Sequence, residues 1–383
     1  MDSILLFRYN KTDDFERSCA ATLFFEWKGG YWMRYQRVVL TAVFLLLAGF
    51  ISAVERAPFV LGPLSANPGE AVSGFLPVPA GNDPETFIPV TIIHGKKEGK
   101  VLTLVAGVHG YEYPPILSLY RLKKMISPDL LSGTLVMVHI ANLPGFQKRI
   151  IYYNPYDWKN LNRVFPGKKE GTQAERIAYV LNTTVIAASD ALIDMHCGDA
   201  NEALIPYCYW MLSGNEELDA LSREMVLSFG IKHIIIDKSR TKDIKDSKYL
   251  GNTAVLQSIP AITTESGYLG GTAEEDIVRN VNGAIGVMKM FGMLAGEPDK
   301  VTDPIWVEDY EVIYSQSDGL FFPLTKMGYF VREGESVGYV TDYFGRVVEE
   351  FKAPFTGMIL YVINTPPANK GEPVYEIGRI RSQ

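Results

Sequence analysis

The chain has 383 residues, is 47% hydrophobic and 21% charged, and carries a formal net charge of −7. This composition is typical of a folded globular protein and excludes a disordered or collagen-like chain. The acidic balance argues against nonspecific nucleic-acid binding, which needs an excess of lysine and arginine. Three cysteines are too few for a disulfide scaffold. Any imidazole-based site must use the five histidines: His94, His109, His139, His196 and His233.

The N-terminal segment, residues 1–54, is typical of a leader outside the fold. An uncharged apolar run at 38–48 follows two arginines and precedes small residues. This order predicts a secretory signal over about residues 33–53. We expect an exported protein, periplasmic or secreted, with membrane association only if the leader stays uncleaved as an anchor. Export would leave Cys197 and Cys208 as the remaining thiols, which could pair in an oxidising compartment.

Residues 55–300 alternate predicted strands with predicted helices. Six apolar, β-rich runs indicate buried strands, at 90–94, 101–108, 134–140, 191–195, 233–237 and 260–264. Helical spacing or an opening proline predicts helices over 114–124, 172–188, 216–229 and 273–294. The alternation predicts an α/β domain with a mainly parallel sheet between two layers of helices. Sites in such sheets gather at the carboxyl ends of the strands.

Residues 305–383 have a different pattern. Eight glycines separate short β segments there, and no helical period remains. The stretch Pro-Asp-Lys-Val-Thr-Asp-Pro at 298–304 is a plausible linker. The sequence therefore predicts a second, smaller all-β domain after the α/β domain.

Candidate metal ligands follow two of the predicted strands. His109 and Glu112 come directly after the strand at 101–108, and His196 follows the strand at 191–195. Zinc accepts imidazole nitrogen and carboxylate oxygen, and two histidines with one glutamate form a known catalytic set. Asp194 could orient one of the imidazoles from behind. Taken alone, each of these features is also compatible with a surface loop or a structural histidine.

The sequence also contains a candidate general base and two candidate substrate-binding arginines. Glu265, after the strand at 260–264, could act as general base on a zinc-bound water and then as acid to the leaving amine, or be a salt-bridged structural carboxylate. Residues 160–167 read Asn-Leu-Asn-Arg-Val-Phe-Pro-Gly. Arg163 in this segment, and Arg149 before it, could bind a carboxylate or stabilise developing oxyanion charge.

These segments occur together in an order that resembles the succinylglutamate desuccinylase/aspartoacylase family, part of the wider group with zinc-carboxypeptidase-like folds. The resemblance covers roughly residues 85–383. It implies a zinc-dependent hydrolase that cleaves an amide bond, typically of an N-acyl amino acid. It also implies one zinc ion per chain, bound by His109, Glu112 and His196, with Glu265 as the general base.

The resemblance extends to substrate contacts and to the C-terminal domain. It implies that Arg163 polarises the scissile carbonyl or holds a substrate carboxylate with Asn162 beside it, and that Arg149 is a second carboxylate or oxyanion contact. The glycine-rich segments after residue 305 resemble a barrel-sandwich domain of the biotinyl/lipoyl type, which members of this family carry. We expect this domain to have a structural or substrate-gating role.

Three functions stay open at this point. The first is an amidohydrolase acting on an N-acyl amino acid, and the second is a peptidase acting on peptide or cell-wall amides with the same metal chemistry. Arg149 and Arg163 favour a substrate with a free carboxylate under both. The third is a non-catalytic binding protein on the same fold, against which the complete set of ligands and base argues. Export argues against N-succinylglutamate or N-acetylaspartate as the substrate.

Overall fold

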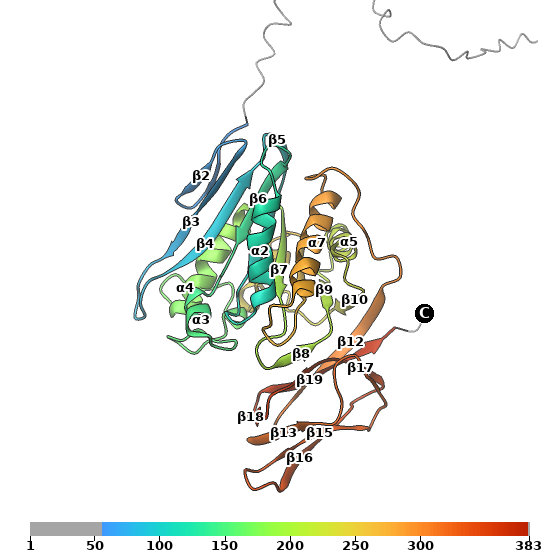
Figure 1. The fold of residues 1–383 in the computed structure, drawn as a ribbon. Coiled ribbons are helices and arrows are strands. Elements are labelled where there is room, and N and C mark those ends of the chain that lie inside the picture. The colour runs from blue at the N-terminus through green and yellow to red at the C-terminus, as the bar shows by residue number, and fades with distance from the viewer. Residues whose placement is uncertain (1–55, 382–383) are drawn as a thin grey trace, which may run out of the picture. The chain divides into compact units, whose positions relative to one another are not determined.

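The structure, a computed structural model, describes residues 56–381 (Figure 1). The predicted leader at 1–54 lies outside the described residues. Within residues 56–381, no helix is both long and apolar enough to cross a membrane.

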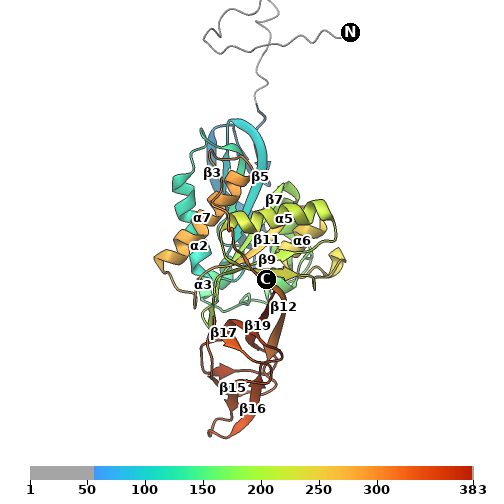
Figure 2. The same cartoon turned by 90° about the vertical axis from the view of Figure 1, so that its right-hand side faces the viewer.

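A large mixed sheet forms the centre of the α/β part and continues into the C-terminal part (Figures 1 and 2). In spatial order its strands are β3 (Glu70–Val78), β4 (Thr86–His94), β6 (Ser132–Val138), β5 (Lys97–Ala106), β7 (Ala191–His196), β11 (Ala261–Glu265), β9 (Tyr207–Met211), β10 (His233–Asp237), β12 (Ile305–Tyr314), β19 (Pro373–Ile380), β17 (Gly357–Ile363) and β14 (Phe330–Val331), while β8 (Glu202–Leu204) pairs with β17. The neighbours β6, β5, β7 and β11 run parallel, as do β9, β10 and β12. An antiparallel contact between β9 and β11 joins the two parallel groups.

Helices cover both faces of this sheet, as predicted. One layer contains α2 (Tyr113–Met125), α5 (Glu216–Phe229) and α7 (Glu274–Met290), and the other contains α4 (Gln173–Val180) and α6 (Leu250–Leu256). In β5, Leu102 and Leu104 pack in the first layer and Val105 in the second. A strand with apolar residues on both faces is buried between two layers, which explains the continuous apolar run in the sequence.

Several element ends differ from the prediction. The helix predicted over 172–188 is α-helical to Val180. It continues as a π-helical turn over Leu181–Val185 and a 3₁₀ turn over Ile186–Ala188. The last helix of the α/β part ends at Met290, because Gly292 has a φ of 67°. This left-handed conformation is favourable for glycine and ends helices. Three strands at the start of the described residues, β1 (Phe59–Leu61), β2 (Leu64–Ala66) and β3, were not predicted, since their exposed residues interrupt any apolar run.

The C-terminal part is all β, as predicted. Its second sheet is antiparallel, with the order β16 (Val347–Lys352), β15 (Ser336–Thr341), β13 (Gly319–Pro323) and β18 (Pro367–Ala368). Phe321, Phe351 and Tyr375 pack edge to face in the core between the two sheets. β12 pairs with β10 on one side and with β19 on the other, so the C-terminal strands extend the central sheet directly. This continuity brings β19 next to the strands of the α/β part (Figure 2), and the Glu376 side chain of β19 accepts a hydrogen bond from the Tyr209 hydroxyl of β9.

Candidate metal centre

Three neighbouring parallel strands, β5, β7 and β11, end at the same edge of the sheet. His196 and Glu265 are the last residues of β7 and β11, and a tight turn after β5 carries His109 and Glu112. Gly110 in this turn has no room for a side chain, because a Cβ would lie 2.1 Å from a backbone nitrogen of α3 (Leu143–Lys148). The sheet topology therefore brings together the four side chains that the sequence placed at strand ends.

His109, Glu112 and His196 form a buried triad that could hold a metal ion, with one ligand atom from each lying within 4.8 Å of the others. The Glu112 carboxylate lies between the two imidazoles: Oε1 is 2.7 Å from Nδ1 of His109, and Oε2 is 2.9 Å from Nδ1 of His196. Burial alone would raise the pKa of Glu112, but the charges of His196 and His109 outweigh it and lower the pKa to about 2. The carboxylate is therefore held ionised, as a metal ligand must be.

Two further side chains orient the imidazoles from the opposite side. Nε2 of His196 lies 3.0 Å from Oδ1 of Asp194, and Nε2 of His109 lies 3.1 Å from Oδ1 of Asn160. An imidazole that donates its Nε2 hydrogen to such a partner presents the Nδ1 lone pair to a metal. Both Nδ1 atoms face Glu112, so the donor set and its orientation fit a zinc ion. Asp194 was expected in this role from its place two residues before His196, whereas Asn160 is 51 positions from His109 and has no comparable local signal.

Glu265 lies beside the triad on the next strand. It is in register with His196 of β7 and with Tyr207 of β9, so the three side chains emerge on the same face of the sheet. Burial raises the pKa of Glu265 well above its usual range, and the nearby carboxylates of Glu112 and Glu202 add to the rise, while His196 opposes it. The raised pKa makes this carboxylate a stronger base than an ordinary glutamate, as a general base requires.

The residues predicted to contact the substrate around the triad take two different positions. Asn162 is buried; its Oδ1 accepts a hydrogen bond from the Leu250 backbone, and its Nδ2 lies 3.3 Å from Nε2 of His196. Asn162 therefore supports the start of α6 and lies beside a metal ligand, without accepting the Nε2 hydrogen that His196 directs to Asp194. Arg163 is exposed, and its guanidinium lies 4.7 Å from the centre of the Tyr249 ring. Its predicted role in substrate binding stays a prediction.

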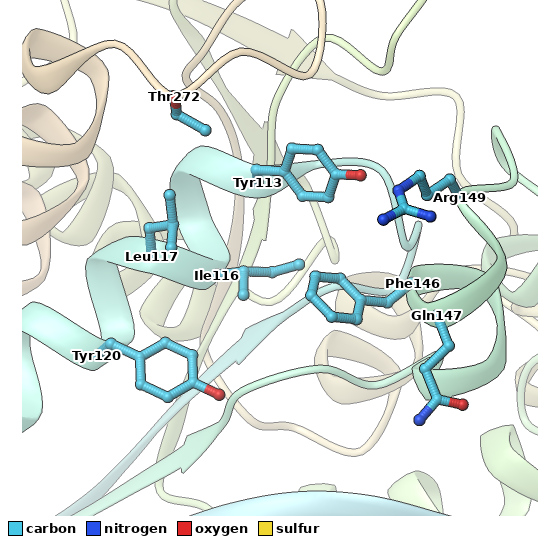
Figure 3. Close-up of a pocket in the computed structure, with 8 residues that line it drawn as sticks. All are labelled: Tyr113, Ile116, Leu117, Tyr120, Phe146, Gln147, Arg149 and Thr272. Carbon is cyan, nitrogen blue, oxygen red and sulfur yellow. The ribbon is translucent and has the colours of Figure 1, made fainter.

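Arg149 lies farther along the same edge. It ends α3 in a left-handed conformation, with a φ of 54°, and its side chain is exposed. Figure 3 shows its guanidinium near the Tyr113 hydroxyl at one end of a groove of about 330 Å³. The groove is lined by Tyr113, Ile116, Leu117, Tyr120, Phe146, Gln147, Arg149 and Thr272. The structure thus places Arg149 in a largely apolar groove beside α2, and its predicted contact with a substrate carboxylate stays a prediction.

The other histidines and the cysteines lie outside the triad. His94 and His139 are buried in hydrogen bonds with threonines, and His233 is half-buried on β10. The pairing of Cys197 and Cys208 that the sequence left possible is not formed: both cysteines are buried and free.

Comparison with known proteins agrees with this geometry. The model of the succinylglutamate desuccinylase/aspartoacylase catalytic domain matches residues 98–290, half of the chain. The chain belongs to this family. It is therefore a member of a family of deacylases, with a histidine–glutamate–histidine site that could hold a metal ion such as zinc.

Individual relatives extend the likeness beyond the catalytic domain. The chain is 26% identical over 320 residues to an N-α-acetyl-L-2,4-diaminobutyric acid deacetylase from Halomonas elongata, covering 80% of this chain and 91% of the relative. A succinylglutamate desuccinylase structure from Silicibacter sp. TM1040 has a TM-score of 0.72 at 23% identity, covering 85% of this chain and 98% of that one. The product-bound ectoine utilization protein EutE (DoeB) from Ruegeria pomeroyi has a TM-score of 0.71 at 23% identity, covering 84% and 98%. These two structures share the fold, including the C-terminal β part.

Proposed function

We propose that this protein is a zinc-dependent deacylase that hydrolyses the amide bond of a small N-acyl amino acid. The observation that carries the proposal is the buried triad of His109, Glu112 and His196 with Glu265 on the adjacent strand. The deacetylase from Halomonas elongata supports a small N-acyl amino acid as the substrate class. The apolar run at 38–48 supports a further proposal, that the protein is exported.

The residues divide the chemistry among them. When bound, zinc supplies a Lewis acid that polarises a carbonyl and lowers the pKa of a coordinated water. Glu265 accepts the proton that the attacking water loses and donates it to the nitrogen of the leaving amine, so that one proton serves both steps. The raised pKa of Glu265 suits a group that must hold this proton between the two steps. In this proposal Arg163, which is exposed beside Tyr249, binds a substrate carboxylate or stabilises oxyanion charge.

An assay of the amine that the full chain releases from its substrates tests this proposal. The substrates are N-acetyl and N-succinyl amino acids and short peptides, each with and without a chelator. We expect N-acyl amino acids to be cleaved, the chelator to abolish cleavage, and Glu265→Gln to lower kcat by about 10²–10⁴ while bound zinc stays unchanged. Glu275→Gln, an exposed position at the start of α7, is the matched control and should not change kcat.

Two results would contradict the proposal. Normal turnover in Glu265→Gln would remove Glu265 from its role as general base. Release of amino acids from peptides, with N-acyl amino acids left intact, would identify the protein as a peptidase instead.

A further inference from the structure

A line of polar side chains leads across the sheet, away from the metal triad. His196, Glu265 and Tyr207 occupy one register row on β7, β11 and β9, and Tyr209 follows two residues after Tyr207 on the same face. The hydroxyl groups of Tyr207 and Tyr209 point to Glu376, which β19 of the C-terminal part supplies. The row therefore connects the candidate metal centre to a carboxylate from the other end of the chain.

Glu376 is a buried carboxylate whose side-chain hydrogen-bond partners are two tyrosine hydroxyls. It is 2% exposed, its oxygens lie 3.2 and 3.3 Å from the Tyr209 hydroxyl, and one of them lies 3.5 Å from the Tyr207 hydroxyl. Among residues 56–381, no lysine, arginine or histidine forms an ion pair with it. The nearby Arg240 is instead paired with Asp237. Two hydroxyl donors leave an ionised carboxylate with unused acceptor capacity.

The pKa of Glu376 reflects this shortage of positive charge. Burial raises the pKa of Glu376, and Asp237 and Glu202 add to the rise, while the Tyr209 hydroxyl and Arg240 offset part of it, so that the pKa is about 8. A purely structural link between β9 and β19 could be formed by a glutamine, which accepts the same hydroxyl hydrogen bonds without the cost of burying an acid. The acid is therefore better explained by a ligand that brings the missing positive charge.

We propose that Glu376, together with the hydroxyl groups of Tyr207 and Tyr209, binds the side-chain ammonium of a diamino acid whose N-acyl derivative is the substrate. This inference rests on the proposed deacylase function and makes its substrate class more specific. The C-terminal part thereby takes a direct role in substrate selection, because β19 carries the charged member of the subsite.

The separation of the strands along the row is comparable with the length of a short diamino acid. His196 and Tyr207 lie two strands apart, which corresponds to about 10 Å at the usual strand spacing. Five bonds separate the scissile carbonyl carbon of N-acetyl-2,4-diaminobutyrate from its side-chain nitrogen, roughly 6 Å when extended. Adding a metal–oxygen contact of about 2 Å and a hydrogen bond of about 3 Å gives a total length similar to the separation of the two strands.

Two acetylated substrates of nearly equal shape test the subsite. N-acetyl-2,4-diaminobutyrate and N-acetylnorvaline differ in a terminal ammonium against a methyl group, and both are assayed at pH 8 with the full chain. We expect wild type to prefer the cationic substrate, and Glu376→Gln to lower the ratio of their kcat/KM values at least tenfold. Glu350→Gln, an exposed carboxylate on β16, is the matched control and should leave the ratio unchanged.

The possible outcomes separate this inference from the proposed function. If wild type cleaves neither substrate in a chelator-sensitive way, the deacylase proposal fails and the inference fails with it. If wild type cleaves both and Glu376→Gln leaves their ratio unchanged, only the inference is overturned. Should Glu376→Gln not fold, inhibition of wild type by the two free amino acids decides: 2,4-diaminobutyrate must inhibit at least tenfold more strongly than norvaline, and equal inhibition overturns the subsite.

Discussion

Two buried glutamates, Glu112 and Glu376, have opposite surroundings in the same fold. Glu112 lies between two imidazoles, and its pKa is lowered to about 2 although burial opposes this. Glu376 lies among tyrosine hydroxyls, and burial raises its pKa to about 8. Both carboxylates are almost fully shielded from solvent, at 2% exposure each. Their different charge preference therefore comes from the neighbours that the fold supplies.

The two carboxylates differ in whether the chain itself supplies the positive charge that faces them. Around Glu112, the imidazole nitrogens that face away from the centre already have partners in Asn160 and Asp194, so the triad is oriented before a ligand arrives. Around Glu376, the chain supplies hydrogen-bond donors and leaves the positive charge to come from elsewhere. We interpret the first arrangement as a permanent metal centre and the second as part of the substrate site.

Removing one imidazole should have the largest effect, because it dismantles the first site. In His196→Ala, the metal loses a ligand and Glu112 loses one of the two groups that keep it ionised. We expect zinc content, measured by elemental analysis, to fall to background and turnover to be lost. His233→Ala, a half-buried histidine on β10, is the control and should retain zinc. Unchanged zinc in His196→Ala would remove His196 from the ligand set.

Removing an orienting group should have a smaller effect on the same site. Asn160→Ala leaves all three ligands in place and takes away the acceptor behind His109. We expect zinc affinity, measured by competition with a chelator, to weaken about 10–100-fold. Asn160→Asp keeps an acceptor oxygen and should restore most of the affinity. Asn215→Ala removes the cap of α5 and controls for a general loss of stability; if it weakens zinc binding equally, the role given to Asn160 is wrong.

The sequence predicted the parts of the molecule that depend on local pattern. Strands buried on both faces, such as β7, are continuous apolar runs, and the parallel neighbours of such strands bring His109, His196 and Glu265 to one edge. The wider architecture of the α/β and all-β parts was predicted for the same reason. The exposed, alternating strand β3 gave no such run and was not predicted.

Long-range pairing accounts for the site residues that were not predicted. Asn160 meets His109 across 51 positions of the chain, and Glu376 meets Tyr207 across 169. In the sequence, Glu376 is one polar residue among apolar neighbours in a short strand, a pattern equally typical of a solvent-facing position. Its burial depends on the pairing of β19 with β12, which no local pattern specifies.

The smallest expected effect is on the pH dependence of stability, to which Glu376 should contribute and Glu112 should not. The folded pKa of Glu376, about 8, exceeds the usual value near 4.3. The folded state therefore binds this proton more tightly than the unfolded state does. The resulting contribution to stability is complete below about pH 4 and is lost as the pH rises through about 8.

Urea unfolding of the chelated full chain and its Glu376→Gln variant measures this difference. Because glutamine does not titrate, we expect the free energy of unfolding of wild type to fall, relative to the variant, by about 1–2 kcal/mol between pH 6.5 and pH 8. Glu112 is expected to contribute nothing to this change, since its lowered pKa leaves it ionised throughout this range. Glu350→Gln should follow wild type at every pH. Parallel curves for wild type and Glu376→Gln would show that Glu376 is already ionised at pH 6.5, and the contrast between the two glutamates would then be wrong.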